Sequence, residues 1–339
     1  MNKRIFVLIA LLVFALPFAA MAQDATPEAT PAVEPIELPA VDVLAVDGDI
    51  ITAGSSTVFP LAERMAELFA EEGFSSNITV DSIGSGAGYE RFCVAGETDI
   101  ANASRAIRDS EIASCAAIGR TPIEFRVGTD ALAVVVSTAN DFLTSLTIAQ
   151  LSAIYSGAAT TWDQVDPSYP AETIQVFSPG SDSGTYDYFL EATLETEAGG
   201  DLEAEGAEAA IQAVPGIQFS EDDNVLVQGV EGSPYAIGYF GFAYYIENQD
   251  LLQAVAIDNG DGPVIPNEES AEAGTYPLAR PLFIYSDATI MLEKPQVAAF
   301  ISYFLTNVND NIIDVGYFPA SVEALNAAKQ AYLDAVGGM

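Results

Sequence analysis

The chain alternates short runs of apolar, β-branched residues with longer segments whose apolar residues recur at helical spacing. In the first unit, an apolar run over residues 50–52 leads into a Gly-Ser-Ser-Thr turn at residues 54–57. A helix should follow, with Pro60 in its first turn, Gly73 at its end and one apolar face made of Leu61, Met65, Leu68 and Phe69. Such alternation predicts an α/β fold with largely parallel strands.

Two later units repeat this layout of strand, Gly/Ser-rich loop and helix. In the second unit these elements are expected at residues 78–80, 84–88 and 89–94. In the third they are expected at residues 174–177, 180–185 and 186 to about 195. Three strand-to-helix turns therefore share one design.

A nearly continuous apolar run from Asp130 to Val136 predicts a strand that is buried on both faces and passes from one domain into the next. Residues 281–285 predict a return strand, and residues 296–307 and 322–336 predict two amphipathic helices. We expect domain 1 to comprise residues 48–134 plus 284–339, and domain 2 residues 135–283. Two such crossings would form a hinge beside a ligand cleft.

The first 22 residues are typical of a secretory signal peptide: a charged start, an apolar stretch over residues 5–19 and a small-x-small site at Ala20-Met21-Ala22. An uncleaved anchor is the alternative, although roughly 20 apolar residues are needed to span a bilayer. No cysteine follows, so there is no lipobox. Residues 23–47, rich in Pro, Ala and Glu, predict an extended linker. We expect export to the periplasm or the cell surface.

The formal charge is −38, from 11 Lys and Arg against 49 Asp and Glu, which argues against nucleic acid or anionic membrane as partners. A small anion is still admissible, because exposed charges are screened beyond about 8 Å. The chain has no histidine, which excludes Ser-His-Asp and Cys-His catalysis and leaves no ordinary zinc site. No Asp-x-Asp-x-Asp-Gly calcium loop is present. We expect neither a metal nor a cofactor.

Cys93 and Cys115 are the only cysteines. An even pair in an exported protein predicts a disulfide, with two buried free thiols as the alternative.

The three Gly/Ser-rich turns carry the candidate chemistry, because a helix start offers unpaired amides and the positive end of the helix dipole to an anion. Each turn alone is also an ordinary helix cap. Arg105 directly follows a short strand and is a candidate partner for an oxyanion, with a surface ion pair as the alternative. Arg91 is the weaker rival, because it falls within a helix.

Four segments now stand in order: Gly54-Ser55-Ser56-Thr57-Val58-Phe59-Pro60, Gly84-Ser85-Gly86-Ala87-Gly88, Asp99-Ile100-Ala101-Asn102-Ala103-Ser104-Arg105 and Ser181-Asp182-Ser183-Gly184-Thr185. From about residue 48 to the end, the chain resembles the PstS family of phosphate-binding proteins, in its SphX-like subgroup. The resemblance implies a type II periplasmic-binding-protein fold and a monomer that binds inorganic phosphate and delivers it to the permease subunits of an ABC importer. It implies no enzymatic activity. It also implies phosphate ligands at Ser56, Thr57, Val58, Ser85, Ser183, Gly184 and Thr185.

The chain departs from that family pattern at two charged positions. Better-known members carry an Arg shortly before the third loop, where this chain has Ser178-Pro179-Gly180, and an Asp near the position of Ser104 that accepts the phosphate proton. We therefore expect Arg105 to supply the guanidinium, and the Ser104 hydroxyl beside it to be a further phosphate ligand. Asp182 is the expected proton acceptor, with helix capping as its alternative role and Asp130 as a second candidate.

Three other functions stay open from the sequence. The ligand could be another tetrahedral anion, such as sulfate, molybdate or tungstate. A phosphate-ester hydrolase with Ser55 or Ser183 as nucleophile would lack the usual histidine base. A structural envelope protein with a vestigial cleft would bind no oxyanion.

Overall fold

The computed structural model describes residues 33–181, 183–195 and 204–337, and Pro35–Met339 form one unit. The strands are β1 (Ile50–Gly54), β2 (Ile78–Ser82), β3 (Ile100–Ala103), β4 (Ile123–Ser137), β5 (Ser145–Thr147), β6 (Gln175–Pro179), β7 (Gln218–Ser220), β8 (Ala236–Gly241), β9 (Leu252–Ala254), β10 (Ala256–Asp258) and β11 (Ala279–Ser286). In the described part of the chain, nine of them form one sheet in the order β2-β1-β3-β11-β4-β8-β6-β7, with β9 also paired to β4. β5 and β10 form a separate parallel pair.

The α-helices are α1 (Phe59–Glu71), α2 (Ser85–Glu90), α3 (Asp109–Ala117), α4 (Ile148–Tyr155), α5 (Trp162–Val165), α6 (Gly184–Phe189), α7 (Ala204–Gln212), α8 (Asp223–Glu231), α9 (Phe242–Glu247), α10 (Glu268–Glu272), α11 (Ala288–Glu293), α12 (Pro295–Asn311) and α13 (Val322–Val336). A short 3-10 helix covers Val43–Ala45, and π-helical turns continue α2 over Arg91–Ala95 and α6 over Leu190–Glu195. The second helix begins at Ser85, four residues earlier than the sequence predicted. Gly84, at φ +84°, turns the chain sharply, so most of the predicted loop is the first turn of a helix.

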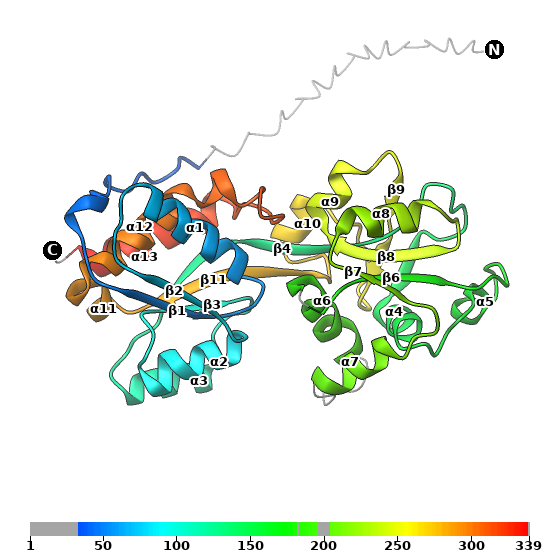
Figure 1. Ribbon diagram of the computed structural model, residues 1–339, viewed down its shortest axis with the longest axis horizontal. Helices are drawn as coiled ribbons and strands as arrows, with labels where there is room; N and C mark the ends of the chain where they lie inside the picture. The colour runs from blue at the N-terminus through cyan, green and yellow to red at the C-terminus, as the bar shows by residue number, and fades with distance from the viewer. Residues whose placement is uncertain (1–32, 182, 196–203, 338–339) are drawn as a thin grey trace, which may run out of the picture. The chain divides into compact units, whose positions relative to one another are not determined.

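Two large hydrophobic clusters lie along the sheet. The first core packs α1, α12 and α13 against the strands around β1 and includes Ile50, Met65, Phe69, Phe300 and Phe304. The second core surrounds the far half of β4 together with β6 and β8, and includes Val134, Trp162, Phe189, Ile237 and Tyr239. Figure 1 shows α1, α12 and α13 on one face of the first half of the sheet and α2 and α3 on the other.

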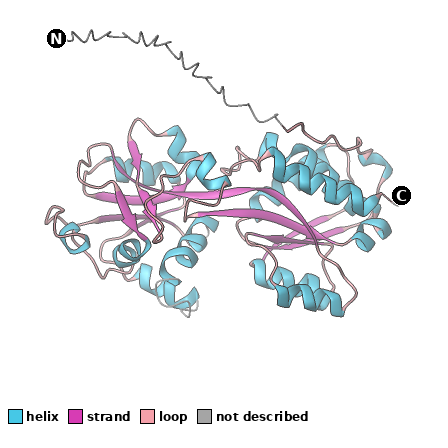
Figure 2. Cartoon of the chain, turned by 180° about the vertical axis from the view of Figure 1, so that it is seen from behind, coloured by secondary structure: helices cyan, strands magenta, loops and turns pink. Residues whose placement is uncertain are grey.

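β4 and β11 are the strands that pass between the two cores (Figure 2). β4 is 15 residues long and is buried along most of its length, as the apolar run predicted. It pairs antiparallel with β8 and β9, and β11 pairs antiparallel with both β3 and β4. The prediction of largely parallel strands therefore holds only for β1 with β2 and β3, for β6 with β7 and β8, and for the separate β5 and β10 pair. The sheet is mixed because the chain leaves the first core on β4 and returns in the opposite direction on β11.

The end of the predicted linker is packed against the first core. Val43 is buried at 7% exposure, and Leu38, Val41 and Val46 contact the first core. The Ile36 amide also donates to Asn326 Oδ1 of α13, at 2.7 Å. The last part of the expected linker therefore packs its apolar side chains against the first core. Residues 1–32, with the predicted signal peptide, lie outside the described residues.

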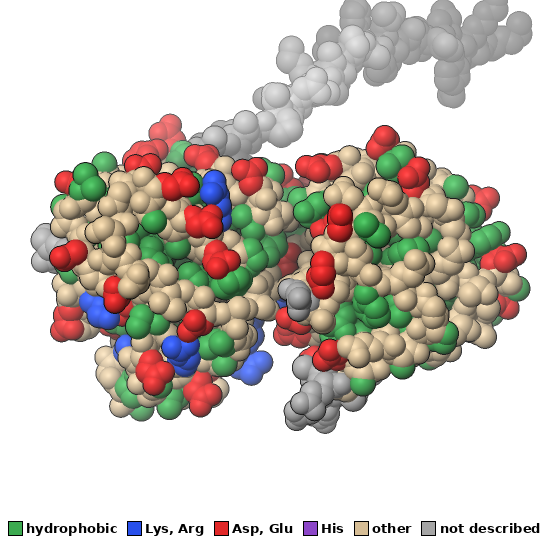
Figure 3. Space-filling model, viewed as in Figure 1, with side chains coloured by type: hydrophobic (Ala, Val, Ile, Leu, Met, Phe, Trp, Pro, Cys, Tyr) green, Lys and Arg blue, Asp and Glu red, His purple; other side chains and the backbone are tan. Residues whose placement is uncertain are grey.

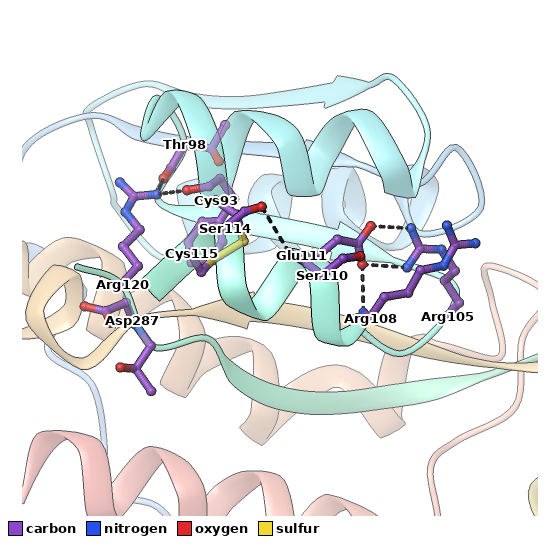
Figure 4. Close-up of a disulfide and its surroundings, with 12 residues drawn as sticks. Cys93, Thr98, Arg105, Arg108, Ser110, Glu111, Ser114, Cys115, Arg120 and Asp287 are labelled. Carbon is purple, nitrogen blue, oxygen red and sulfur yellow. Dashed lines mark hydrogen bonds and ion pairs between the residues drawn. A yellow bond between two sulfur atoms is a disulfide. The ribbon is translucent and has the colours of Figure 1, made fainter. Parts of the chain in front are cut away.

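Cys93 and Cys115 form a disulfide, as the sequence predicted, and both are buried. The bond joins the π-helical turn after α2 to α3, and Figure 4 places it on the same helix as Glu111. It therefore fixes α3 beside the helix that starts at Ser85.

Removing the disulfide should lower the free energy of unfolding by about 3 kcal/mol, because the bond closes a loop with a sequence separation of 22 residues. The test is urea unfolding of a Cys93→Ala/Cys115→Ala double variant, with reduced wild-type protein as the control. Equal free energies for the variant and the oxidised wild type would contradict this prediction.

Among the described residues, no helix is both long and apolar enough to cross a bilayer.

Candidate functional site

A cavity of about 480 Å³ lies where the Gly/Ser-rich turns at residues 54–57 and 84–88, beside the first core, face α6. From the first core come Ser55, Ser56, Thr57, Gly84, Ser85, Gly86 and Ser104, and from α6 and its π-turn come Asp187, Leu190, Glu191 and Glu195. Three guanidinium groups complete the wall, those of Arg105, Arg108 and Arg280. Figure 3 shows acidic side chains scattered across the visible face, with most of the basic ones gathered around α2 and α3.

Three serine hydroxyls meet at the end of β1 and β3. Ser55 Oγ donates to Ser104 Oγ at 3.0 Å, and Ser85 Oγ lies 3.3 Å from the same oxygen. The Ser104 amide donates to Ser85 Oγ at 3.1 Å. β1 and β3 are parallel neighbours, so the residues that follow them emerge at the same edge of the sheet. The predicted first and second loops and the residues after β3 therefore share one site.

Arg280, at the start of β11, is a basic residue in the middle of this site, and it was not among the residues predicted from the sequence. Its Nη1 donates to Ser104 Oγ at 3.4 Å, and its Nη2 donates to Thr57 Oγ1 and to the carbonyl oxygen of Gly184 at 3.3 Å. It is only 8% exposed. One guanidinium thus contacts the first loop, the end of β3 and the third loop.

Two neighbours hold the Arg280 guanidinium in place. Asp130 Oδ2 accepts from Arg280 Nε at 3.2 Å. On the guanidinium's face, Arg280 Cζ lies 3.7 Å from the centroid of the Tyr188 ring. Asp130 is 1% exposed, and burial raises the pKa of its carboxyl, against the attraction of Arg280. Within the described residues, Asp130 Oδ1 has no hydrogen-bond partner. Register on antiparallel β4 and β11 sets Asp130 opposite Arg280.

Arg105 lies on the cavity wall, but Glu111 of α3 engages its guanidinium. Two hydrogen bonds of 2.9 and 2.7 Å join Arg105 Nη1 and Nη2 to the two Glu111 oxygens, as Figure 4 shows. The same guanidinium lies over the Tyr89 ring at 5.0 Å. In this structure Arg105 is thus in an ion pair with Glu111, which was the alternative to its binding an oxyanion. The rival Arg91 pairs with Asp81 at 2.6 Å and does not line the cavity.

The third loop reaches the site chiefly through its backbone. Ser183 caps α6 by accepting from the Thr185 amide at 3.2 Å, and Gly184 offers its carbonyl to Arg280. A Cβ at Gly184 would lie 3.2 Å from Thr57 Cα, so the third loop touches the first.

Neither of two other predicted ligands is among the described residues that line the cavity. Val58, which follows the first loop, is fully buried. Asp182 lies outside the described residues.

The α6 side of the cavity is acidic. Asp187, Glu191 and Glu195 follow one another at four-residue spacing along α6 and its π-turn and line the cavity. Asp187 Oδ2 accepts from Ser56 Oγ at 3.1 Å, and burial raises the pKa of the Asp187 carboxyl. Glu191 lies 3.6 Å from Arg280. A carboxylate wall of this kind disfavours ligands that bring only negative charge and no proton.

The comparisons with known proteins extend over most of the chain. Residues 27–308 match the model of a PBP superfamily domain. A solved structure described as a possible phosphate binding protein from Planctomyces limnophilus aligns with a TM-score of 0.77 and 35% identity, over 86% of this chain and 99% of that one. The predicted periplasmic-binding-protein fold class is thereby confirmed.

Two curated relatives have comparable coverage. Protein SphX of Synechococcus elongatus is 43% identical over 84% of this chain and 81% of that protein. The phosphate-binding protein PstS of Staphylococcus saprophyticus is 34% identical over 80% of each chain. The chain therefore belongs to the PBP superfamily, in the family that contains SphX and the PstS phosphate-binding proteins.

Proposed function

We propose that this protein binds inorganic phosphate in the cavity between its two cores and delivers it to the permease subunits of an ABC importer. The observation that carries the proposal is Arg280, a nearly buried guanidinium that contacts Thr57 of the first loop, Ser104 at the end of β3 and Gly184 of the third loop. Relatives named as phosphate-binding proteins match most of the chain, and this supports the same ligand here.

The oxyanion would be held by one charged group and several neutral donors. Arg280 supplies the central charge, and charge-assisted hydrogen bonds contribute roughly 1.5 to 3 kcal/mol each. The first core adds the hydroxyls and amides of Ser56, Thr57, Ser85 and Ser104, and the Val58 amide. Arg105 stays in the proposal as a second guanidinium at the cavity wall, paired with Glu111. Micromolar affinity needs only about 8 kcal/mol in total.

The third loop contributes Ser183, Gly184 and Thr185 in this proposal. Their support is the contact of Gly184 with both Thr57 and Arg280. A small rearrangement of the α6 start would turn the Thr185 amide from the Ser183 hydroxyl toward the ligand.

A carboxylate that accepts a proton from the ligand would favour phosphate over sulfate, because sulfate carries no proton near neutral pH. Asp182 and Asp130 remain the two candidates from the sequence. Asp187 is a third, because it lines the cavity and lies 3.1 Å from Ser56 Oγ.

The remaining properties follow from this function. The protein would be a monomer without cofactor or enzymatic activity, and would not bind nucleic acid. Domain movement would occur about β4 and β11, between residues 48–134 with 284–339 and residues 135–283. Residues 1–22 would direct export to the periplasm or the cell surface.

Calorimetry should show phosphate binding to the purified protein, with sulfate far weaker. Equal affinities would contradict the phosphate assignment, and a preference for molybdate or tungstate would replace it. Asn variants of Asp182, Asp130 and Asp187 then identify the acceptor, because only its loss should admit sulfate while leaving phosphate bound. A phosphatase assay is the control for the enzyme alternative with Ser55 or Ser183 as nucleophile.

A further inference from the structure

Residues 316–321, the second part of the connection between α12 and α13, contact the second core although both helices belong to the first. Phe318 pairs with Thr129 of β4 through two backbone hydrogen bonds, of 3.0 and 2.8 Å. Its ring packs against Phe242 of α9, with the centroids 4.8 Å apart. Residues 316–321 therefore form a non-covalent link between the cores, in addition to the strands β4 and β11.

β4 is shaped to receive this link at Gly128. A Cβ there would lie 2.1 Å from Ile312 Cδ1 and 3.0 Å from the carbonyl oxygen of Phe318. A side chain at residue 128 would therefore displace the Ile312 side chain and press on the backbone of Phe318.

Glu272, the last residue of α10, anchors the end of the connection. One carboxylate oxygen accepts from the amide of Ser321, which caps α13, at 3.0 Å. The other accepts from Arg126 Nη2 at 2.7 Å and from Thr129 Oγ1 at 2.5 Å. The Arg126 and Glu272 side chains are only 24% and 18% exposed, so these charge-assisted bonds are partly shielded from water.

Tyr317 carries the link to the anion site. Its hydroxyl donates to the backbone carbonyl oxygen of Thr57 at 2.8 Å. Burial raises the pKa of Tyr317, so the phenol stays protonated and remains a donor. Thr57 lines the cavity and accepts from Arg280 through its own hydroxyl. One hydrogen bond thus joins the first loop to a segment that packs against both cores, through Tyr317 on the first and Phe318 on the second.

We propose that residues 316–321 couple the second core to the first anion loop, with Tyr317 and Glu272 as positioning residues. A rotation of the second core about β4 and β11 moves Phe242 and Glu272, and with them Phe318 and Ser321. Tyr317 then moves with its neighbours and displaces Thr57 through their hydrogen bond. The effect on affinity rests on the proposed phosphate function, whereas the mechanical coupling does not.

Hydrogen exchange without ligand tests the coupling itself. In Tyr317→Phe, the backbone amides of residues 58–62 other than Pro60 should exchange faster. In Glu272→Gln, these amides and those of residues 316–325 other than Pro319 should exchange faster. Tyr303→Phe is the matched control, because Tyr303 packs against Phe69 in the first core. Wild-type exchange over residues 58–62 in both variants would overturn the coupling.

Phosphate calorimetry tests the consequence for binding. We expect Tyr317→Phe to weaken phosphate affinity about fivefold, the equivalent of one net hydrogen bond, and Glu272→Gln to weaken it by a similar factor. Wild-type affinity in both variants would refute the positioning role. Failure of the wild-type protein to bind phosphate would instead refute the proposed function, and the exchange measurement would still decide the coupling.

Discussion

Replacing Arg280 by alanine should lower phosphate affinity by about a hundredfold or more, since removing one partner of a buried, hydrogen-bonded charge pair costs 2 to 5 kcal/mol. The guanidinium contacts Thr57, Ser104 and Gly184, so its loss removes the common partner of the first loop, the end of β3 and the third loop. The measurement is isothermal titration calorimetry with inorganic phosphate.

The single variant also leaves Asp130 buried without its cation, which destabilises a protein by about 3 to 5 kcal/mol. An Arg280→Gln/Asp130→Asn double variant avoids this charge imbalance and should fold while still binding phosphate poorly. Arg105→Ala is the matched control, because Glu111 already engages that guanidinium. We expect it to lower affinity by about tenfold. A larger loss in Arg105→Ala than in the double variant would return the central role to Arg105.

Gly54→Ala should be the most destabilising single methyl addition at the site. A Cβ there would lie 1.9 Å from the backbone carbonyl oxygen of Asn102, on the neighbouring strand β3, and the Gly54 φ angle is +150°. The strand cannot move aside easily, because β1 is paired on both edges. We expect a loss of about 4 kcal/mol or more, at the upper end of what single substitutions cause.

Gly119→Ala distinguishes the cost of a steric clash from the cost of a positive φ angle in a residue other than glycine. Gly119 also has a positive φ, +81°, but a Cβ there meets no atom within 4 Å. That variant should cost only about 1 kcal/mol. Urea unfolding of both variants gives the comparison, and similar losses would show that the contact with Asn102 is not what requires glycine.

Much of the fold could be predicted because local patterns dominate it. The helical face ending at Phe69 and the apolar run over residues 130–136 are fixed by side-chain periodicity, which does not depend on distant partners. Boundaries were less predictable. The second helix begins at Ser85 because Gly84 turns the chain there. Glycine has a low helix propensity, so the glycine-rich segment 84–88 was predicted to be a loop.

Some residues of the candidate site could be predicted from the sequence and others could not. Ser56, Ser85 and Ser104 could be proposed from the sequence because each follows a strand, and parallel strands present their ends at one edge. Asp130 could be singled out, but its partner could not. Arg280 stands immediately before a predicted strand, and the scarcity of basic residues was the one signal that could have drawn attention to it.

By itself, the sequence determined the α/β class, the three hydroxyl-rich loops and the cysteine pair that forms the disulfide, because these depend on spacing along the chain. Only the tertiary structure decided which cation lies at the centre. Arg105 is near the loops in sequence but is bound by Glu111, whereas Arg280 is 150 residues from Asp130 and reaches it through the register of β4 and β11. Register between distant antiparallel strands is set by the packing of the whole sheet, so no local pattern of residues reveals it.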